Sequence, residues 1–225
     1  MNPTDPADRW YGVYPATVAK LAGDPLSRQR IQVALDWLPR SDGGGPATAW
    51  ATVVSPYADA EEGLRMLPSV GSTVLVGFEA GYPDRPYVLG ATWNGKAPMP
   101  EEPTDANDLR VLRTRSGTRL EFDDTPGAVA VRLSVAGTDG PVHRLTFDDA
   151  AGSITLASAS GATVTLTPDG GVSIDAAATV SVSAAMVTVD AEMSTFSGTV
   201  VCDTLIATGG GVASPAYTPG LGNVW

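Results

Sequence analysis

Several residue types are scarce in this chain of 225 residues, and each scarcity excludes a class of site. Cys202 is the one cysteine, so no disulfide forms within the chain, and we expect its side chain to be small, apolar and buried. His143 is the one histidine, which argues against a Ser-His-Asp relay or a Cys/His metal cluster. The sequence has no glycine-rich phosphate loop, no signal-peptide pattern and no apolar run of membrane-spanning length. It therefore predicts no cofactor and no metal.

Positive charge is also scarce. Lys and Arg number 14 against 25 Asp and Glu, and a net charge of −11 argues against a nucleic-acid partner. No Lys or Arg follows Arg144, whereas seven acidic residues do. Aromatic residues are concentrated in the N-terminal part, because ten of the 15 precede residue 99. These asymmetries predict two parts of different physical character.

Residues 153–207 repeat one short pattern of two apolar residues separated by a single residue. Such alternation is typical of a strand with one buried face. Gly, Ser, Ala, Thr and Asp lie between the pairs and suit sharp turns. A repeat of nearly fixed period indicates stacked short strands. The pairs are Ile154/Leu156, Val164/Leu166, Val172/Ile174, Val180/Val182 and Val187/Val189.

Strands this short cannot bury their apolar side chains within one chain. A lone flat ladder with free edges would also tend to aggregate. Three identical chains wound together would bury these faces on a common axis. We therefore interpret residues 111–207 as the shaft of an interwoven homotrimeric triangular β-helix, or β-prism. Its predicted trimer core is Leu120, Phe122, Leu145, Phe147, Ile154, Leu156, Val164, Leu166, Val172, Ile174, Val180, Val182, Val187 and Val189.

A longer repeat lies at the start of this shaft. The segment LEFDD at 120–124 returns 25 residues later as LTFDD at 145–149. Since 25 residues are about three of the later eight-residue steps, both copies are predicted to lie on one face of a three-sided prism. We interpret the two Asp pairs as strand-ending turn residues rather than as catalytic carboxylates or a Ca²⁺ loop.

The residue pattern of the N-terminal part predicts a small β-barrel. Strand patterns occur at 11–18, 30–35, 50–54, 74–79 and 86–91, with turn residues between them and no helical pattern. Five short strands in about 90 residues fit an OB-fold barrel over residues 9–98. The fold class is therefore all-β. The remaining segments are a flexible tail at 1–8, a Pro-rich acidic linker at 99–110 and a Gly/Pro-rich C-terminal cap at 208–225.

Two stretches of this predicted barrel resemble a known family. Residues 67–81, LPSVGSTVLVGFEAG, resemble phage baseplate assembly protein V. Residues 84–95, DRPYVLGATWNG, resemble both that protein and the OB domain of type VI VgrG spikes. The sequence departs from the family pattern at Gln29, where Gly is frequent, and at Tyr82, where an acidic residue is expected.

The resemblance implies a central spike of a contractile injection system or phage tail, without enzymatic activity. In this family the barrel docks on a hub protein below the inner tube, and the homotrimeric needle pierces the target envelope when the sheath contracts. The implied partners are the hub, the tube and baseplate, and a PAAR-type tip protein, with only transient contact with the target membrane. Assembly in the bacterial cytoplasm into a phage tail-like particle is also implied. Candidate residues for the tip platform are Leu205, Tyr217 and Trp225.

The alternative interpretation is a tailspike or adhesin β-helix that binds or cleaves surface polysaccharide. Such a protein needs a groove lined by aromatic and carboxylate side chains. The aromatic residues of the shaft, Phe122, Phe147 and Phe196, fall instead at core-type positions. The sequence leaves open the kind of particle, the tip protein, the cargo, the target cell, a metal on the trimer axis and the role of the C-terminal tail.

Overall fold

The computed structural model describes residues 9–95, 97–137, 140–206 and 208. These residues hold strands and one 3₁₀ turn, η2 (Glu79–Gly81), with no α-helix among them. The chain forms two units, one ending at Ala178 and the other beginning at Thr179. No helix in the described part is long and apolar enough to cross a membrane.

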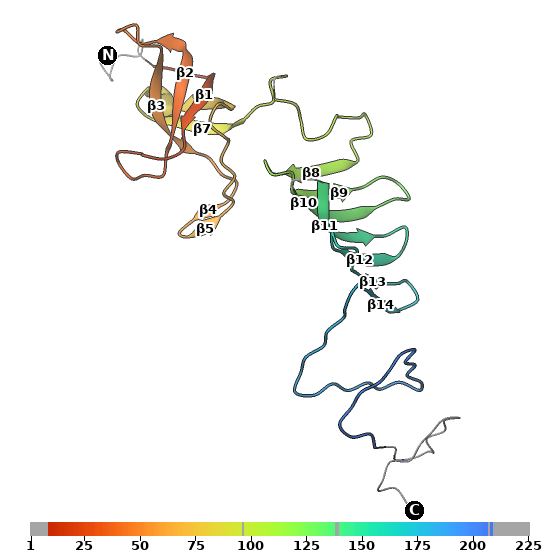
Figure 1. The fold of residues 1–225 in the computed structure, drawn as a ribbon. Coiled ribbons are helices and arrows are strands. Elements are labelled where there is room, and N and C mark those ends of the chain that lie inside the picture. Colours follow the sequence, from red (N-terminus) through yellow and green to blue (C-terminus); the bar gives the residue numbers. More distant parts are fainter. Residues whose placement is uncertain (1–8, 96, 138–139, 207, 209–225) are drawn as a thin grey trace, which may run out of the picture. The chain divides into compact units, whose positions relative to one another are not determined.

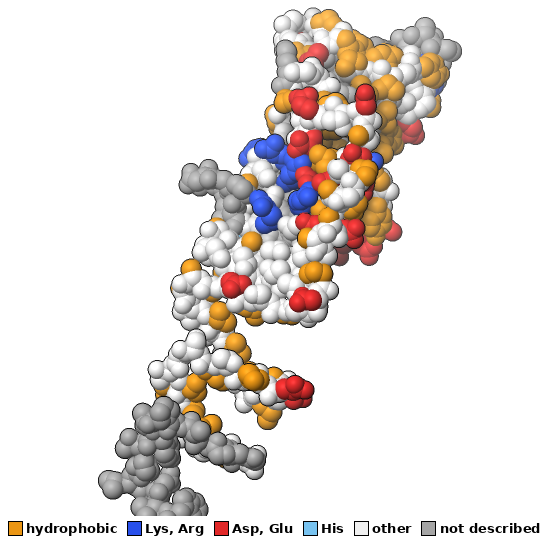
Figure 2. All heavy atoms as spheres, turned by 90° about the vertical axis from the view of Figure 1, so that its right-hand side faces the viewer, with side chains coloured by type: hydrophobic (Ala, Val, Ile, Leu, Met, Phe, Trp, Pro, Cys, Tyr) orange, Lys and Arg blue, Asp and Glu red, His pale blue; other side chains and the backbone are white. Residues whose placement is uncertain are grey.

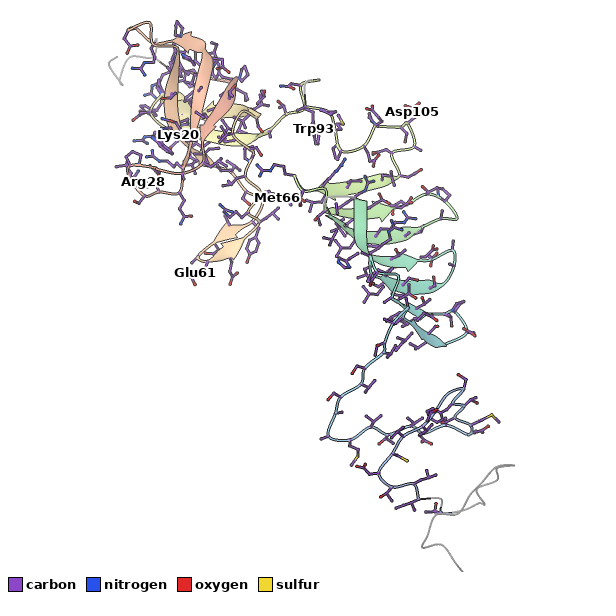
Figure 3. All side chains as sticks on the ribbon, in the orientation of Figure 1. Lys20, Arg28, Glu61, Met66, Trp93 and Asp105 are labelled. Carbon is purple, nitrogen blue, oxygen red and sulfur yellow. The ribbon has the colours of Figure 1, made fainter. Side chains whose placement is uncertain are left out.

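A closed five-stranded barrel occupies the N-terminal part, as predicted (Figure 1). Its hydrogen-bonded order is β1-β2-β3-β7-β6 and back to β1. Only the pair β3–β7 is parallel. A short hairpin, β4 (Ala58–Asp59) and β5 (Glu62–Gly63), was not predicted, and Glu61 lies at its tip (Figure 3). The barrel strands are β1 (Val13–Lys20), β2 (Ile31–Pro39), β3 (Pro46–Val53), β6 (Thr73–Phe78) and β7 (Pro86–Ala91).

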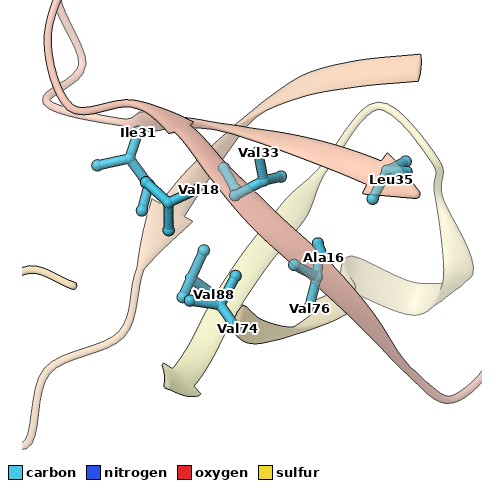
Figure 4. Packing of buried hydrophobic residues seen from close by; sticks show 9 residues of the cluster. Ala16, Val18, Ile31, Val33, Leu35, Val74, Val76 and Val88 are labelled. Atoms are coloured by element: carbon cyan, nitrogen blue, oxygen red, sulfur yellow. The ribbon is translucent and has the colours of Figure 1, made fainter. Parts of the chain in front are cut away.

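The barrel closes around a core of its own (Figure 4). Alternate residues of each strand point inward, as the period of a strand requires. Fully burying one Val, Leu or Ile side chain contributes roughly 1.5–3 kcal/mol. The nine core residues are only 0–3% exposed, and they are Ala16, Val18, Ile31, Val33, Leu35, Ala51, Val74, Val76 and Val88.

An aromatic cluster covers one end of this core. Tyr14 at the start of β1, Trp37 near the end of β2 and Phe78 at the end of β6 meet there, because β1 runs antiparallel to both neighbours. Tyr14 stacks on Trp37 at a centroid distance of 4.8 Å. Trp10 contacts Trp37 and Phe78 edge-on at 5.1 and 4.9 Å. Such pairs add to the stability that area burial provides.

The two departures from the family pattern have local explanations. Gln29 adopts φ = 58°, the left-handed region that favours glycine. Asp24 stabilises this turn, because its carboxylate accepts hydrogen bonds from the backbone N–H of Arg28 and from Arg30. The ring of Tyr82 lies 3.5 Å from the Arg9 guanidinium carbon, so a cation–π contact stands where an acidic side chain was expected.

The second sheet is a seven-stranded antiparallel meander in which each strand pairs with the next along the chain. The single chain thus shows successive hairpins rather than a coil. The 25-residue repeat does not correspond to three steps of a coil. It leads from β9 to β11, the two strands that flank β10. The strands are β8 (Leu109–Arg113), β9 (Arg119–Asp123), β10 (Ala130–Gly137), β11 (Gly140–Asp148), β12 (Ser153–Ala157), β13 (Thr163–Leu166) and β14 (Val172–Asp175).

Described residues after Asp175 form no strand, although the sequence predicts strands at 180–182 and 187–189. A strand is stabilised by ladder hydrogen bonds to a partner, and one copy supplies none to this segment. In Figure 3 the side chains of 179–206 project from a chain path that carries no strand. The expectation of paired strands here therefore fails for a single chain.

Candidate trimerisation surface

The register of the meander places apolar residues in two rows on one face of the sheet. Antiparallel pairing sets Leu120 opposite Leu133, and Leu133 opposite Leu145. Because side chains alternate between faces, the residues two positions away form a parallel second row on the same face. The first row is Leu112, Leu120, Leu133, Leu145, Leu156, Val164 and Ile174. The second is Phe122, Val131, Phe147, Ile154, Leu166 and Val172.

This apolar face is uncovered in the single chain. Leu156 is 54% exposed, Ile174 58% and Phe147 44%. Ala130 is the one buried apolar residue among those described in the sheet. Contiguous apolar patches of this extent are rare on monomeric proteins and mark interaction sites.

The opposite face of the sheet is polar. Its central row across the last strands is Thr146, Thr155, Thr165 and Ser173. On the first strands the same row holds Glu121 opposite Arg132, with an oxygen–nitrogen distance of 2.7 Å. Alternation of apolar and polar faces is typical of a sheet with one wet side, so only the apolar face lacks a partner.

Ion pairs reinforce the polar face of β9 and β10. Arg119 pairs with Glu121 and with Glu101 from the preceding connection. Arg132 donates to Glu121 and to Asp123, the latter at 2.8 Å. The Arg132 contact, together with hydrogen bonds from Thr125, lowers the pKa of Asp123 to about 2. Desolvation raises the pKa of Glu121, but its hydrogen bonds to Arg132 and Arg119 outweigh this and leave the pKa below its ordinary value.

Ten of the predicted trimer-core residues lie together on the apolar face, from Leu120 to Ile174. Sequence reasoning missed three members of the rows, Leu112, Val131 and Leu133. Strict alternation through 131–135 was the signal that would have found two of them. The assignment of these residues to a trimer core stays a prediction, since one copy is present.

The other predicted core residues, Val180, Val182, Val187 and Val189, lie in the second unit and are 55–72% exposed. Cys202 is exposed as well, so the expectation that it is buried is wrong for the single chain. Leu205, a candidate for the tip platform, is 74% exposed. Tyr217 and Trp225 lie outside the described residues.

The residues considered for chemistry lie apart from any assembled centre. His143 is exposed on β11 opposite Val135. Asp123 and Asp148 accept hydrogen bonds from the backbone N–H groups of Thr125 and Ala151, at 3.1 and 2.9 Å, and so cap the turns that follow their strands. The turn interpretation is therefore confirmed for the first residue of each pair. In the described part of the chain, no group of three or more His, Cys, Asp or Glu side chains is arranged to hold a metal.

Comparison with known families agrees with the two-part structure. Residues 14–93 match the type VI secretion system/phage-baseplate injector OB domain, which is the barrel. Residues 135–195 match the phage baseplate V C-terminal trimerisation domain. The match begins within β10 and continues past β14 into the segment without strands. Both parts of the chain thus match domains of phage-baseplate and type VI injector proteins.

Relatives of this baseplate V-like chain include much longer spike proteins. It is 28% identical over 109 residues to the type VI secretion system spike protein VgrG3 of Vibrio cholerae, covering 46% of this chain and 11% of the relative. It is 27% identical over 126 residues to the actin cross-linking toxin VgrG1 of the same species (52% and 12%). It is 26% identical over 128 residues to VgrG1b of Pseudomonas aeruginosa (54% and 17%). The chain thus spans less than a fifth of the length of each.

Proposed function

We propose that this chain is the homotrimeric, non-enzymatic central spike of a contractile injection system or phage tail. The observation that carries the proposal is the apolar face of the meander, which is continuous over seven strands and has nothing to cover it in one copy. Residues 135–195 match a trimerisation domain, which supports two further copies as the cover. Three such faces turned toward a common axis would bury the rows and leave the threonine face in water.

The segment 179–206 completes the shaft in this proposal. Its apolar residues are exposed throughout, and its backbone lacks ladder partners in one chain. Winding with two other copies would supply both, since neighbouring chains donate the missing hydrogen bonds and cover Val180, Val182, Val187 and Val189. A closed braid of this kind has no free sheet edge, which suits a part that bears load along its axis.

The barrel serves attachment in this proposal. It closes around its own core, so its outer surface is available to a separate hub protein below the tube. Match of residues 14–93 to an injector OB domain supports this role. A PAAR-type protein would cover the distal end, near Leu205, and the particle would assemble in the bacterial cytoplasm and touch the target membrane only as it is pierced.

A polysaccharide-binding tailspike is less well supported. The aromatic residues within β8–β14 are Phe122 and Phe147, and both belong to the apolar face. The exposed polar face carries Thr, Ser and charged residues but no ring on which a sugar can stack.

The test is the place of the chain in an assembled particle. Particles are purified from the producing bacterium with an epitope tag on this chain, and from a strain that lacks it. Electron microscopy should show the label at the baseplate end, and the deletion strain should yield no particle competent for injection. Label found along the tail fibres, with glycan binding by the purified chain and normal injection by the deletion strain, would refute the proposal and favour the tailspike.

A further inference from the structure

Arginine side chains form a row on the polar face of the first four strands of the meander. Antiparallel pairing sets Arg113 opposite Arg119, and Arg119 opposite Ser134. Ser134 in turn lies opposite Arg144, and we name these four residues the basic row. The row belongs to the polar face, because Arg119 is two positions from Glu121 and side chains alternate between faces. Figure 2 shows basic side chains gathered in one patch, with none on the visible part toward the C-terminus.

Two arginines of this row have no ion-pair partner among the described residues. Arg113 and Arg144 are exposed, and neither contacts a carboxylate there. Arg119, which lies between them, pairs with Glu121 and with Glu101 of the connection that precedes the sheet. The row thus already binds one carboxylate from outside the sheet. Because guanidinium groups bind carboxylates in a fixed fork geometry, the two unpaired arginines fit an acidic segment.

The β4–β5 hairpin of the barrel carries an acidic tip, which we define as Asp59, Glu61 and Glu62. All three residues are exposed, and the described part of the chain offers none of them an ion-pair partner. The Glu62 carboxylate accepts a hydrogen bond from the Tyr57 hydroxyl, which fixes its place beside the hairpin stem. Residues 58–63 contain no Lys or Arg, so the tip has the charge that the basic row lacks.

Local contacts hold this hairpin in shape, although none of its residues belongs to the barrel core. The Tyr57 carbonyl accepts hydrogen bonds from the Ser55 hydroxyl at 2.8 Å and from the Leu64 N–H at 2.9 Å. Gly63 adopts φ = 141°, and a Cβ there would lie 2.6 Å from the same carbonyl oxygen, so only glycine fits. A preformed hairpin loses little conformational entropy when it binds, which suits a recognition element.

The hairpin and the shaft leave the barrel at the same end. Strand β3 leads into the hairpin and β7 leads toward the shaft, and these two strands pair in parallel, so they end together. The connection to the shaft is held at two points. Asn94 donates to the Thr73 hydroxyl at 2.9 Å, and Glu101 binds Arg119. Since the seven residues from 94 to 101 span at most about 25 Å, the barrel end with the hairpin is tethered close to the level of the basic row.

We infer that the acidic tip of each copy binds the basic row of a neighbouring copy. The inference rests on the proposed homotrimer and adds a contact that joins the barrel of one copy to the shaft of the next. In that trimer the apolar faces turn toward the axis, so the basic rows point outward and stay accessible. The neighbouring copy is the source, because the tip and the row of one chain form no ion pair with each other among the described residues. In a ring of three every interface is heterologous, so each tip meets one row.

Cross-linking between cysteines placed among the charged residues tests this contact. The full chain carries A60C in the tip and S134C in the row, with C202S to remove the native thiol, so that every charge is kept. A short bismaleimide should convert the trimer into products of two and three times 23.1 kDa on a denaturing gel. The matched control combines A60C with T165C, which lies on the same polar face three strands beyond β10 and should stay at 23.1 kDa.

Charge reversal shows whether the contact is electrostatic. In the A60C/S134C background, R113E/R144E and D59R/E61R should each lower the cross-linked fraction about 3- to 10-fold at low salt. Combining the two reversals should restore most of it, because opposite charges then face each other again. Salt near 1 M should lower the yield of the unreversed chain, because it screens exposed charges.

Three results would overturn the inference and leave the proposed function standing, provided that the unmodified chain is a trimer in solution. The first is a cross-link confined to one chain, seen as an internally bridged product of single-chain mass. The second is a yield no higher than that of the A60C/T165C control. The third is a yield that both charge reversals leave unchanged. A wild-type chain that stays a single copy of 23.1 kDa would overturn both the contact and the proposed function.

Discussion

The barrel and the meander are both all-β, yet they solve the burial of apolar side chains in different ways. Nine residues of the barrel are 0–3% exposed, whereas the meander has thirteen apolar side chains in its two rows and buries Ala130 alone among its described residues. A sheet that closes into a barrel encloses an interior, whereas both faces of an open meander are exposed in a single chain. The same alternation of residues therefore makes a core in one case and an interface in the other.

The largest effect on assembly is expected from a charge placed on the apolar face of the meander. Leu156→Asp would set three carboxylates on the axis of the proposed trimer, and an unpaired buried charge costs several kcal/mol. We expect complete loss of the trimer by light scattering, while the barrel keeps its near-UV circular dichroism from the aromatic cluster.

The control for this variant is the adjacent residue. Thr155→Asp introduces the same charge on the polar face of the same strand, opposite Thr146 and Thr165. The mass of the assembly that this variant forms in solution should equal that of the wild type. Equal behaviour of the two variants would show that the two faces of the sheet are not distinguished by assembly.

The converse change weakens the barrel and spares the shaft. Ile31 is 1% exposed in the barrel core, and Ile→Ala substitutions in cores cost about 2–5 kcal/mol. Urea unfolding monitored by tryptophan fluorescence should show an earlier barrel transition, with the assembly state unchanged at low urea. A trimer that dissociates together with the barrel transition would show that the barrel contributes to the assembly, contrary to the comparison.

Acid is expected to weaken the meander through Asp123. The folded pKa of Asp123, about 2, lies below its unfolded value of roughly 3.9. Its contribution to stability is therefore complete above about pH 4 and is lost as the pH falls toward 2. Arg132→Gln removes the main cause of the shift, so the stability of this variant should depend less on pH between 4 and 2 than that of the wild type.

This prediction is checked by thermal unfolding at a series of pH values, followed by far-UV circular dichroism. Arg40→Gln is the control, because Arg40 pairs with Asp42 on an exposed loop of the barrel. Identical pH profiles for wild type and Arg132→Gln would exclude a role of the ion pairs on the polar face of β9 and β10.

The smallest expected effect concerns Tyr82 in the barrel, which stands where the family pattern has an acidic residue. Tyr82→Leu removes the cation–π contact with Arg9 but keeps apolar bulk, so the barrel should lose about 0.5–1 kcal/mol. Chemical denaturation can resolve this difference, and Tyr82→Phe is the control that retains the ring. A loss in the Phe variant equal to that in the Leu variant would assign the effect to the hydroxyl.

The sequence predicted the structure correctly where its apolar residues alternate with the two-residue period of a strand. The five barrel strands and the apolar face of β9 to β14 follow from alternation, which needs no knowledge of partners. The β4–β5 hairpin was missed because its strands have two residues each and little apolar content. The 25-residue repeat was assigned the wrong number of steps, since spacing alone cannot distinguish a coil from a hairpin whose turns vary in length.

The register of the meander was beyond the sequence for a different reason. Which residues of neighbouring strands become partners, as Leu133 does with Leu120 and Leu145, is known only from the pairing itself. The Asp pairs signalled turns correctly, because Asp123 and Asp148 each accept a hydrogen bond from the turn that follows.

The mass of the purified chain in solution tests the central claim most directly. Light scattering coupled to size exclusion should give three times 23.1 kDa, about 69 kDa, with hydrogen exchange slow along the apolar strands β9 to β14. A stable, well-folded species of 23.1 kDa whose β9–β14 amides are already protected would contradict the account, because the apolar rows would then need no other copy to cover them.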